Sequence, residues 1–281
     1  MTSAISAASP SPASWNVLRE GRSGELMAVV DFSATGRSVA TFAELVTLLG
    51  TGETVWETAP PPFGREAGMT GADHVARWLD DLRADGRPVR AVLGFCTGAV
   101  YAAALAEGIA GRQPNPPAVV LLDPVLSDRE LLYQQYERLL GGRLSAVLSQ
   151  DEAGRAREAG RRAVAEAAGE LDLAGRLSAL LREYGGAALT RAGLDARRSA
   201  ELVGTFTAYL CYLAAAAEFD PTPVWSTATA VSSNTPDSGL NLLSEERRAA
   251  LVGREIRLAV CYPDLLRSDE VARTVAAVLA S

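Results

Sequence analysis

The sequence predicts an α/β protein whose mostly parallel central sheet is covered by helices on both faces. Apolar runs rich in Val, Leu and Ile alternate along the chain with segments whose apolar residues recur at helical spacing. These runs are nearly continuous rather than alternating, which is typical of strands buried on both sides. The chain has 281 residues, of which 48% are hydrophobic and 22% charged, enough for one such domain with a substantial core.

The predicted elements follow in order. In the first half, strands are expected at 25–33, 54–58, 89–94 and 118–125, and helices at 39–49, 69–84 and 99–109. Near the end, a strand is expected at 223–231, a short helix at 245–252, a strand at 255–262 and a closing helix at 269–279. Residues 1–14 are rich in Ser, Ala and Pro and offer little to bury, so we expect them to be disordered and the domain to span 15–281.

Between about residues 127 and 219 the strands stop. This segment is almost entirely helix-forming, with expected breaks at Gly141-Gly142, Gly169 and Gly185-Gly186. It predicts a set of helices inserted between two strands. The aromatic side chains Phe206, Tyr209 and Tyr212 are candidates to line a pocket beneath it, although a helix packed on the sheet has the same pattern.

Composition excludes several classes of function. A net charge of −7 with no basic run disfavours nucleic acid and anionic membranes as partners. The N-terminus lacks the features of a signal peptide, and no window approaches roughly 18 uninterrupted apolar residues, so we expect a cytoplasmic protein. Three cysteines and one histidine give no disulfide framework and no metal-ligand spacing, and we expect neither a metal nor a cofactor.

The five residues Gly94-Phe95-Cys96-Thr97-Gly98 form the most informative motif. They follow a predicted strand and precede a predicted helix, the arrangement of a nucleophile elbow. The glycines permit a sharp turn, and the central side chain is held at the positive end of the helix. That position stabilises a thiolate, so Cys96 is a candidate nucleophile.

General bases are scarce in this chain. His74 is the single histidine, it precedes the elbow, and the sequence contains no lysine. His74 lies on the helix predicted at 69–84, and we interpret it as a surface or half-buried helix residue. Cysteine depends less on a base than serine does, because a stabilised thiol is partly ionised near neutral pH.

These motifs resemble the α/β-hydrolase thioesterases of nonribosomal peptide and polyketide assembly lines, over nearly the whole chain. The elbow matches, Asp123 in the phrase Asp-Pro ends the next strand where such enzymes carry the triad acid, and residues 127–219 correspond to the helical lid. The segment Val29 to Ser38 is similar to the oxyanion loop. The resemblance implies an α/β-hydrolase fold, with the backbone N–H groups of Thr97 and of the loop around Thr35 as oxyanion donors.

The chain departs from the family after its final strand. There the family carries the triad histidine, whereas this sequence reads Tyr262-Pro263-Asp264-Leu265-Leu266. We expect Tyr262 in the place of the histidine, with Tyr262 and Asp264 near Cys96 or engaged in ordinary loop packing and helix capping. Without histidine, the usual role of Asp123 in orienting it disappears.

The resemblance implies substrates bound as thioesters to the phosphopantetheine of an acyl or peptidyl carrier protein. The leading hypothesis is transfer of an acyl or aminoacyl group through Cys96 to another acceptor, because activation of water is poor without histidine. The alternatives are a hydrolytic editing or releasing thioesterase that uses Asp264 or His74 as base, a catalytically inactive homologue that binds a carrier protein or small ligand, and a non-hydrolytic cyclase.

Overall fold

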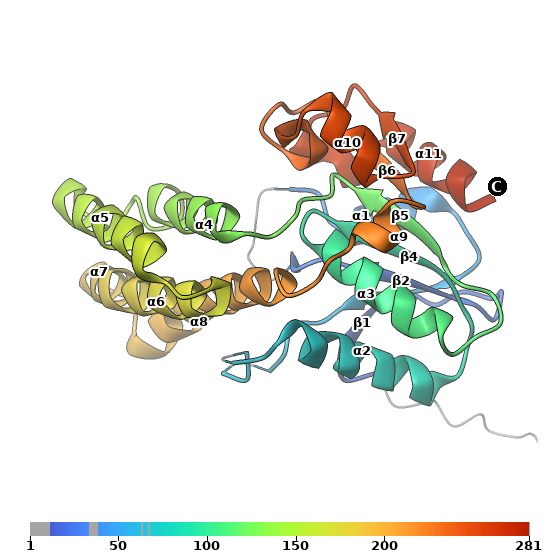
Figure 1. Ribbon diagram of the computed structural model, residues 1–281. Coiled ribbons are helices and arrows are strands. Elements are labelled where there is room, and N and C mark those ends of the chain that lie inside the picture. The colour runs from blue at the N-terminus through green and yellow to red at the C-terminus, as the bar shows by residue number, and fades with distance from the viewer. Residues whose placement is uncertain (1–11, 34–38, 63, 67, 281) are drawn as a thin grey trace, which may run out of the picture.

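The computed structural model describes residues 12–33, 39–62, 64–66 and 68–280. Within these residues it contains one sheet of seven strands in the order β1-β3-β2-β4-β5-β6-β7 (Figure 1). The strands are β1 Trp15–Arg19, β2 Leu26–Val30, β3 Thr54–Thr58, β4 Val89–Phe95, β5 Ala118–Leu122, β6 Thr229–Ser232 and β7 Arg254–Arg257. β1 pairs antiparallel with β3 at one edge, and the other described pairs are parallel.

Helices cover both faces of this sheet, as predicted. Those before the insertion are α1 Phe42–Leu49, α2 Gly71–Asp85 and α3 Gly98–Ala110, and those after it are α9 Thr222–Trp225, α10 Glu245–Leu251 and α11 Asp269–Ala280. Two short 3₁₀ segments are η3 Gly239–Leu242 and η4 Tyr262–Arg267.

The core has two layers because successive strand residues point to opposite faces. In β2, Met27 and Val29 pack with α1 and α11, whereas Leu26, Ala28 and Val30 pack with α2 and α3. All five of these side chains are buried. The central strands therefore have no polar face, which explains why their sequences are continuous apolar runs.

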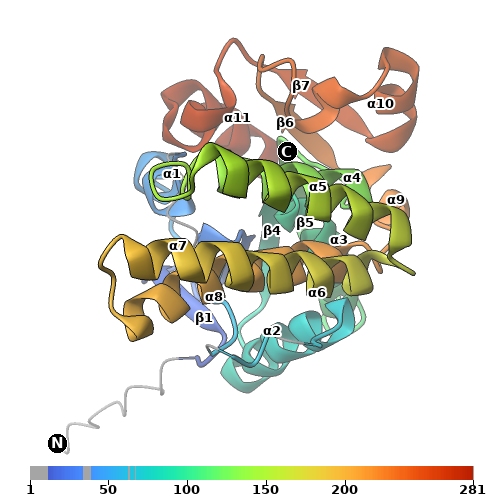
Figure 2. The ribbon, with the colours of Figure 1, turned by 90° about the vertical axis from the view of Figure 1, so that its left-hand side faces the viewer.

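The insertion between β5 and β6 is helical. It contains α4 Arg129–Gly141, α5 Gln150–Glu166, α6 Glu170–Leu180, the π-helical turn η2 Leu181–Gly185, α7 Gly186–Arg191 and α8 Ala196–Ala216. These helices project beyond the sheet and cover the carboxyl ends of its strands (Figures 1 and 2). The Tyr101 Oη donates to the Tyr212 carbonyl at 2.7 Å, and the Ser127 Oγ donates to the Leu213 carbonyl at 2.6 Å, so α8 is tied to the sheet domain.

The predicted break at Gly185-Gly186 is wrong. The chain passes through η2 directly into α7, and the left-handed residue that ends this helical run is Gly193, with φ 89°. Gly185 has a different role, because a Cβ there would lie 3.1 Å from Leu144 Cδ1. Tight packing, rather than chain reversal, accounts for glycine at this position.

Other differences lie at the ends of the domain. The strand β1 was not predicted, and Ser14, assigned to the disordered start, is buried and donates its N–H to Asp81 at 2.7 Å. Residues 1–11 of that start lie outside the described residues. Of the strand predicted at 223–231, the first part is the helical turn α9, and the strand predicted at 255–262 ends at Arg257.

The turn between β4 and α3 places Cys96 at the middle of the sheet edge. Cys96 has φ 54°, a left-handed conformation that is uncommon for a residue with a Cβ. Gly94 packs against Ala99 in α3, where an added Cβ would lie 2.7 Å from Ala102 Cβ. Gly98 packs against the backbone of β2, where an added Cβ would collide with the Val30 carbonyl oxygen. Both glycines are therefore required by close packing.

We predict that Gly98→Ala lowers the free energy of unfolding by about 2–3 kcal/mol, because the backbone of β2 cannot move away from the new methyl group. Gly111→Ala, at the other end of α3, is the matched control. The Gly111 φ is −70° and an added Cβ has its nearest neighbour at 3.9 Å, so this change should alter stability by less than about 0.5 kcal/mol. Urea unfolding followed by circular dichroism measures both, and equal effects would contradict the packing argument.

Candidate functional site

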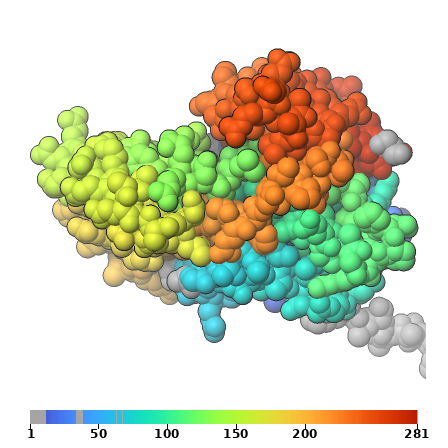
Figure 3. Space-filling model, in the orientation of Figure 1, coloured from blue at the N-terminus to red at the C-terminus, as the bar shows by residue number. Residues whose placement is uncertain are grey.

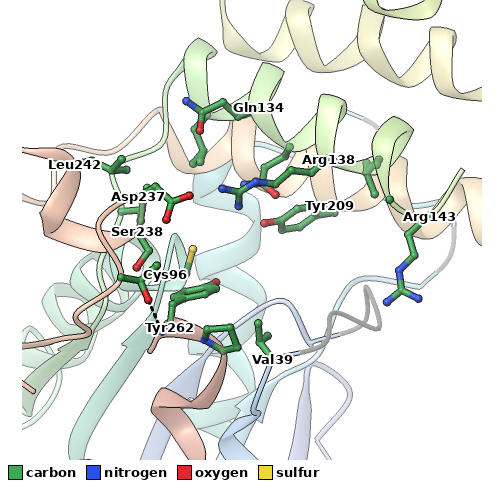
Figure 4. A pocket seen from close by; sticks show the side chains of 17 residues that line it. Val39, Cys96, Gln134, Arg138, Arg143, Tyr209, Asp237, Ser238, Leu242 and Tyr262 are labelled. Atoms are coloured by element: carbon green, nitrogen blue, oxygen red, sulfur yellow. Dashed lines mark hydrogen bonds between the residues drawn. The ribbon is translucent and has the colours of Figure 1, made fainter. Parts of the chain in front are cut away.

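Cys96 opens into a cavity of about 500 Å³ between the sheet edge and the insertion (Figure 4). The walls come from the elbow, from α4 and α8, from the loop after β6, and from η4. Its described lining residues are Val39, Cys96, Val125, Leu131, Gln134, Gln135, Arg138, Leu139, Gly142, Arg143, Tyr209, Thr235, Asp237, Ser238, Leu242, Tyr262 and Pro263. A cavity of this size accommodates a small organic ligand.

The elbow holds Cys96 at the N-terminus of α3. The Cys96 N–H donates to the Leu122 carbonyl at 3.0 Å, and its carbonyl accepts from Ala99 N at 3.1 Å. The first amides of a helix have no acceptor within the helix and carry partial positive charge, so they can stabilise an anion that forms beside Cys96. Thr97, predicted as an oxyanion donor, follows directly and is 2% exposed. Thr35, the other predicted donor, lies outside the described residues.

Asp123 is completely buried at the end of β5 and has φ 45°. Its Oδ1 accepts from the Ser233 N–H at 2.8 Å, and its Oδ2 accepts from the Ser233 and Ser238 hydroxyls, each at 2.7 Å. These donors occupy both carboxylate oxygens. Sequence reasoning missed Ser233 and Ser238, and the polar run Ser232-Ser233-Asn234-Thr235 after the strand β6 was the available signal.

Tyr262 and Asp264 lie in η4 but differ in position. Tyr262 lines the cavity beside Cys96, and its ring stacks on Phe95 with centroids 5.2 Å apart. Asp264 is exposed and is absent from the described lining. It accepts from the Cys261 thiol at 3.0 Å and pairs with Arg267 at 3.5 Å. The Asp264 hydrogen bond raises the pKa of the Cys261 thiol.

Of the three aromatic residues predicted to line a pocket beneath the insertion, one lines the Cys96 cavity. Tyr209 lines the Cys96 cavity from α8. Phe206 and Tyr212 are buried in the core, and neither is among the described lining residues. Their helix packs on the sheet domain, where Tyr212 contacts Phe32 and Tyr101 at centroid distances of 5.1 and 4.5 Å.

The polar side chains of the cavity include cations but no histidine among the described residues. Arg138 and Arg143 reach it from α4 and the segment after it, and in the described part of the chain neither has a carboxylate within 4.0 Å. Asp237 is the sole carboxylate among the described lining residues (Figure 4). The cavity therefore suits an anionic group at its α4 wall and offers little to activate water.

His74 is buried, in contrast to our interpretation of a surface or half-buried residue. It is 2% exposed and lies among Trp78, Tyr101 and Tyr212, with ring centroids 5.7–5.8 Å apart. Neither ring nitrogen has a hydrogen-bond partner among the described residues. Burial, together with the charge of Arg77, lowers the pKa of His74 to about 4. His74 is also absent from the described lining of the Cys96 cavity.

Among the described residues, no cluster of three or more His, Cys, Asp and Glu side chains is arranged to hold a metal ion. No helix in this part of the chain combines the length and the apolar character needed to span a membrane.

Comparison with solved structures finds proteins of the same architecture. The Vlm2 thioesterase domain with genetically encoded 2,3-diaminopropionic acid, bound with a dodecadepsipeptide, is 14% identical with a TM-score of 0.54, over 94% of this chain and 97% of that chain. The NocB thioesterase domain in covalent complex with a fluorophosphonate nocardicin G analog is 16% identical with a TM-score of 0.53, over 95% and 100%.

The enol-lactonase from Burkholderia xenovorans LB400 is 14% identical with a TM-score of 0.52, over 95% of this chain and 96% of that chain. No protein-family model matches the sequence, and neither does any curated protein. Together with the mostly parallel sheet, these likenesses show that the chain adopts an α/β-hydrolase fold.

The position of His74 predicts a pH dependence of stability. An unfolded histidine titrates near pH 6.5, whereas folded His74 titrates near 4. Between these values the unfolded chain binds a proton that the folded protein does not, so stability falls as pH falls, by about 3 kcal/mol across the window.

The free energies of unfolding of wild type and His74→Phe are measured by urea unfolding from pH 7.5 to 4.5. Their difference isolates the contribution of His74 from that of the carboxylates. The variant should gain relative stability as pH decreases. A difference that stays constant over this range would contradict the assignment.

Proposed function

We propose that this protein is a thioesterase-like acyltransferase in which Cys96 accepts an acyl or aminoacyl group from a thioester and passes it to a second acceptor. The observation that carries the proposal is the placement of a thiol, rather than a histidine-activated hydroxyl, at a strained elbow facing a cavity with no described histidine in its lining. A thiol is the nucleophile that needs a base least.

The chemistry requires no cofactor. The Cys96 Sγ attacks the thioester carbonyl, and the C–S bond to the incoming carrier thiol breaks after a tetrahedral intermediate has formed. The departing thiol takes the proton that Cys96 gives up. The N–H of Thr97, at the start of α3, would stabilise the intermediate's oxyanion. Because one thioester replaces another, the step is nearly isoenergetic, and a thiol or amine acceptor can reverse or complete it.

The arginines of the insertion support a carrier-bound substrate. A phosphopantetheine arm carries a phosphodiester, and Arg138 and Arg143 line the cavity without an ion pair among the described residues. A guanidinium binds phosphate through paired hydrogen bonds. Vlm2 and NocB, whose fold this chain shares, are thioesterase domains, which is consistent with a thioester as the substrate proposed here.

The Asp123 network favours transfer over hydrolysis. In a Ser-His-Asp triad, the acid orients a histidine that activates water. Here both Asp123 oxygens accept hydrogen bonds from the loop after β6, through Ser233 and Ser238. Asp123 therefore orients no histidine to activate water against an acyl group on Cys96, which favours transfer to a thiol or amine.

The same network also supports a second candidate, a protein that binds an acyl thioester without reacting. An occupied Asp123 and the absence of a histidine from the described lining of the cavity fit such a binder equally well. A hydrolytic thioesterase and a cyclase each need a base, and the described lining offers the Asp237 carboxylate but no histidine. The formation of a covalent adduct separates the transferase from the binder.

We expect intact-protein mass spectrometry to detect one acyl adduct after incubation with acyl-phosphopantetheine thioesters. Cys96→Ala should abolish the adduct, whereas Cys261→Ala, at an exposed thiol outside the described lining, should retain it. Saturable binding of the thioester without any adduct would favour the binder. An adduct that survives Cys96→Ala would exclude this elbow as the site.

We further expect Ser238→His to convert transfer into hydrolysis. Ser238 bonds to Asp123 and lines the cavity with Cys96, so an imidazole there can face both groups. The half-life of the acyl adduct in buffer should shorten at least about tenfold, a smaller effect than the roughly 10²–10⁴-fold that a well-positioned general base contributes. Ser238→Asn, which introduces a polar side chain without a comparable base, is the control and should leave the half-life within about twofold.

A further inference from the structure

A second cavity lies on the other side of α8. It has a volume of about 510 Å³ and is bounded by residues 64–66, by η2 and α7, and by the N-terminal part of α8. The loop before α2 passes beneath α8 at this point (Figure 1), and the same region forms a protruding edge of the surface (Figure 3). Ala200, Val203, Gly204 and Thr207 line it, and helical spacing places them on the face of α8 opposite Tyr209.

This cavity contains buried polar groups without partners. Glu66 is 7% exposed, and its Oε2 has no hydrogen-bond partner among the described residues. Ser199 is 5% exposed, and its Oγ is also unpartnered in the described part of the chain. Both residues line the cavity. A buried carboxylate oxygen without a hydrogen bond is unfavourable. A ligand that donates hydrogen bonds to Glu66 Oε2 and Ser199 Oγ would remove this cost.

Arg182 lines the same cavity but does not form an ion pair with Glu66. Arg182, in η2, has no carboxylate within 4.0 Å among the described residues, Glu66 included. Both charges lie near Cys211, because Glu66 contributes to raising the pKa of that thiol and Arg182 opposes the effect, although burial is the largest cause. Glu66 and Arg182 thus line one cavity without forming an ion pair with each other, so a single ligand can contact both.

The wall between these charges is small and mostly apolar. Gly186, Ala196, Ala200 and Gly204 leave space, and Val203 adds an apolar surface. A Cβ at Gly186 would have no neighbour within 4 Å, so this glycine faces open volume. The π-helical turn η2 adjoins the cavity, and such turns occur frequently at functional sites.

We propose that this cavity is a binding site for an amino acid. Its ammonium group donates to Glu66 and Ser199, its carboxylate accepts from Arg182, and its aliphatic portion lies against Ala200 and Val203. A ligand with both charges satisfies every unpaired group that the cavity presents. An amine alone leaves Arg182 without a partner, and a carboxylate alone would be repelled by Glu66. The site is separate from Cys96 and stands whether or not Cys96 transfers acyl groups.

Isothermal titration calorimetry on the full chain tests this proposal with L-leucine and 5-aminopentanoate, each compared with pentylamine and pentanoate. We expect at least one of the two amino acids to bind with a dissociation constant at least tenfold below those of the amine and the acid. Glu66→Gln and Arg182→Gln should each weaken that binding at least tenfold. Gly186→Leu should abolish it by filling the cavity.

Glu183→Gln is the matched control, because Glu183 is an exposed neighbour of Arg182 in η2 that is absent from the described lining. It should leave the affinity within twofold. Glu66→Gln should fold at least as stably as wild type, since it removes an unpaired buried charge, and it keeps the test valid if Gly186→Leu does not fold. No binding of either amino acid at millimolar concentration, equal binding of pentylamine, or binding unchanged in Glu66→Gln would overturn the proposal.

Discussion

The close contact between the elbow and the neighbouring strand is the constraint on which the rest of the site depends. Gly98 lies against the Val30 carbonyl, and Cys96 adopts a left-handed conformation that costs on the order of 1–2 kcal/mol. The Cys96 N–H donates to the Leu122 carbonyl and the Cys96 carbonyl accepts from Val125 N, so the end of β5 holds the strained residue in place. Strain of this kind persists only where surrounding structure determines it fully, and it holds the thiol at the sheet edge.

Asp123 shows how a buried carboxylate at this sheet edge is satisfied without a histidine. A buried carboxylate needs hydrogen-bond donors, and in a triad one of them is imidazole. Here the loop after β6 brings Ser233 and Ser238 to both carboxylate oxygens, and Gly239 packs so closely that a Cβ there would lie 2.6 Å from Oδ1. The acid is thus held as a structural centre that joins β5 to this loop. Its surroundings leave no room for an added ring unless one of the serines is replaced.

Sequence patterns predicted the elements that local periodicity specifies. They failed for elements and contacts that are determined by tertiary packing. The central strands and the elbow at Cys96 follow from apolar runs and glycine spacing, and they were placed within a few residues. The strand β1 was missed because it gains its structure from pairing with β3 at the edge. The segment after Pro221 was predicted as a strand, yet it forms a helical turn in which Trp225 Nε1 donates to the Ala99 carbonyl. The polar run after β6 marked Ser233 as a candidate, but neither its bond to Asp123 nor the burial of His74 could be derived, because each depends on which elements meet in space.

The helix α8 forms part of the wall of both cavities. Its C-terminal part is fixed to the sheet domain through the Tyr212 and Leu213 carbonyls, while its N-terminal part lies wholly within the insertion. Tyr209 on one face lines the Cys96 cavity, and Val203 and Thr207 on the other line the second one. The same helix therefore supplies one wall of each cavity through opposite faces, because residues about half a helical period apart point in opposite directions.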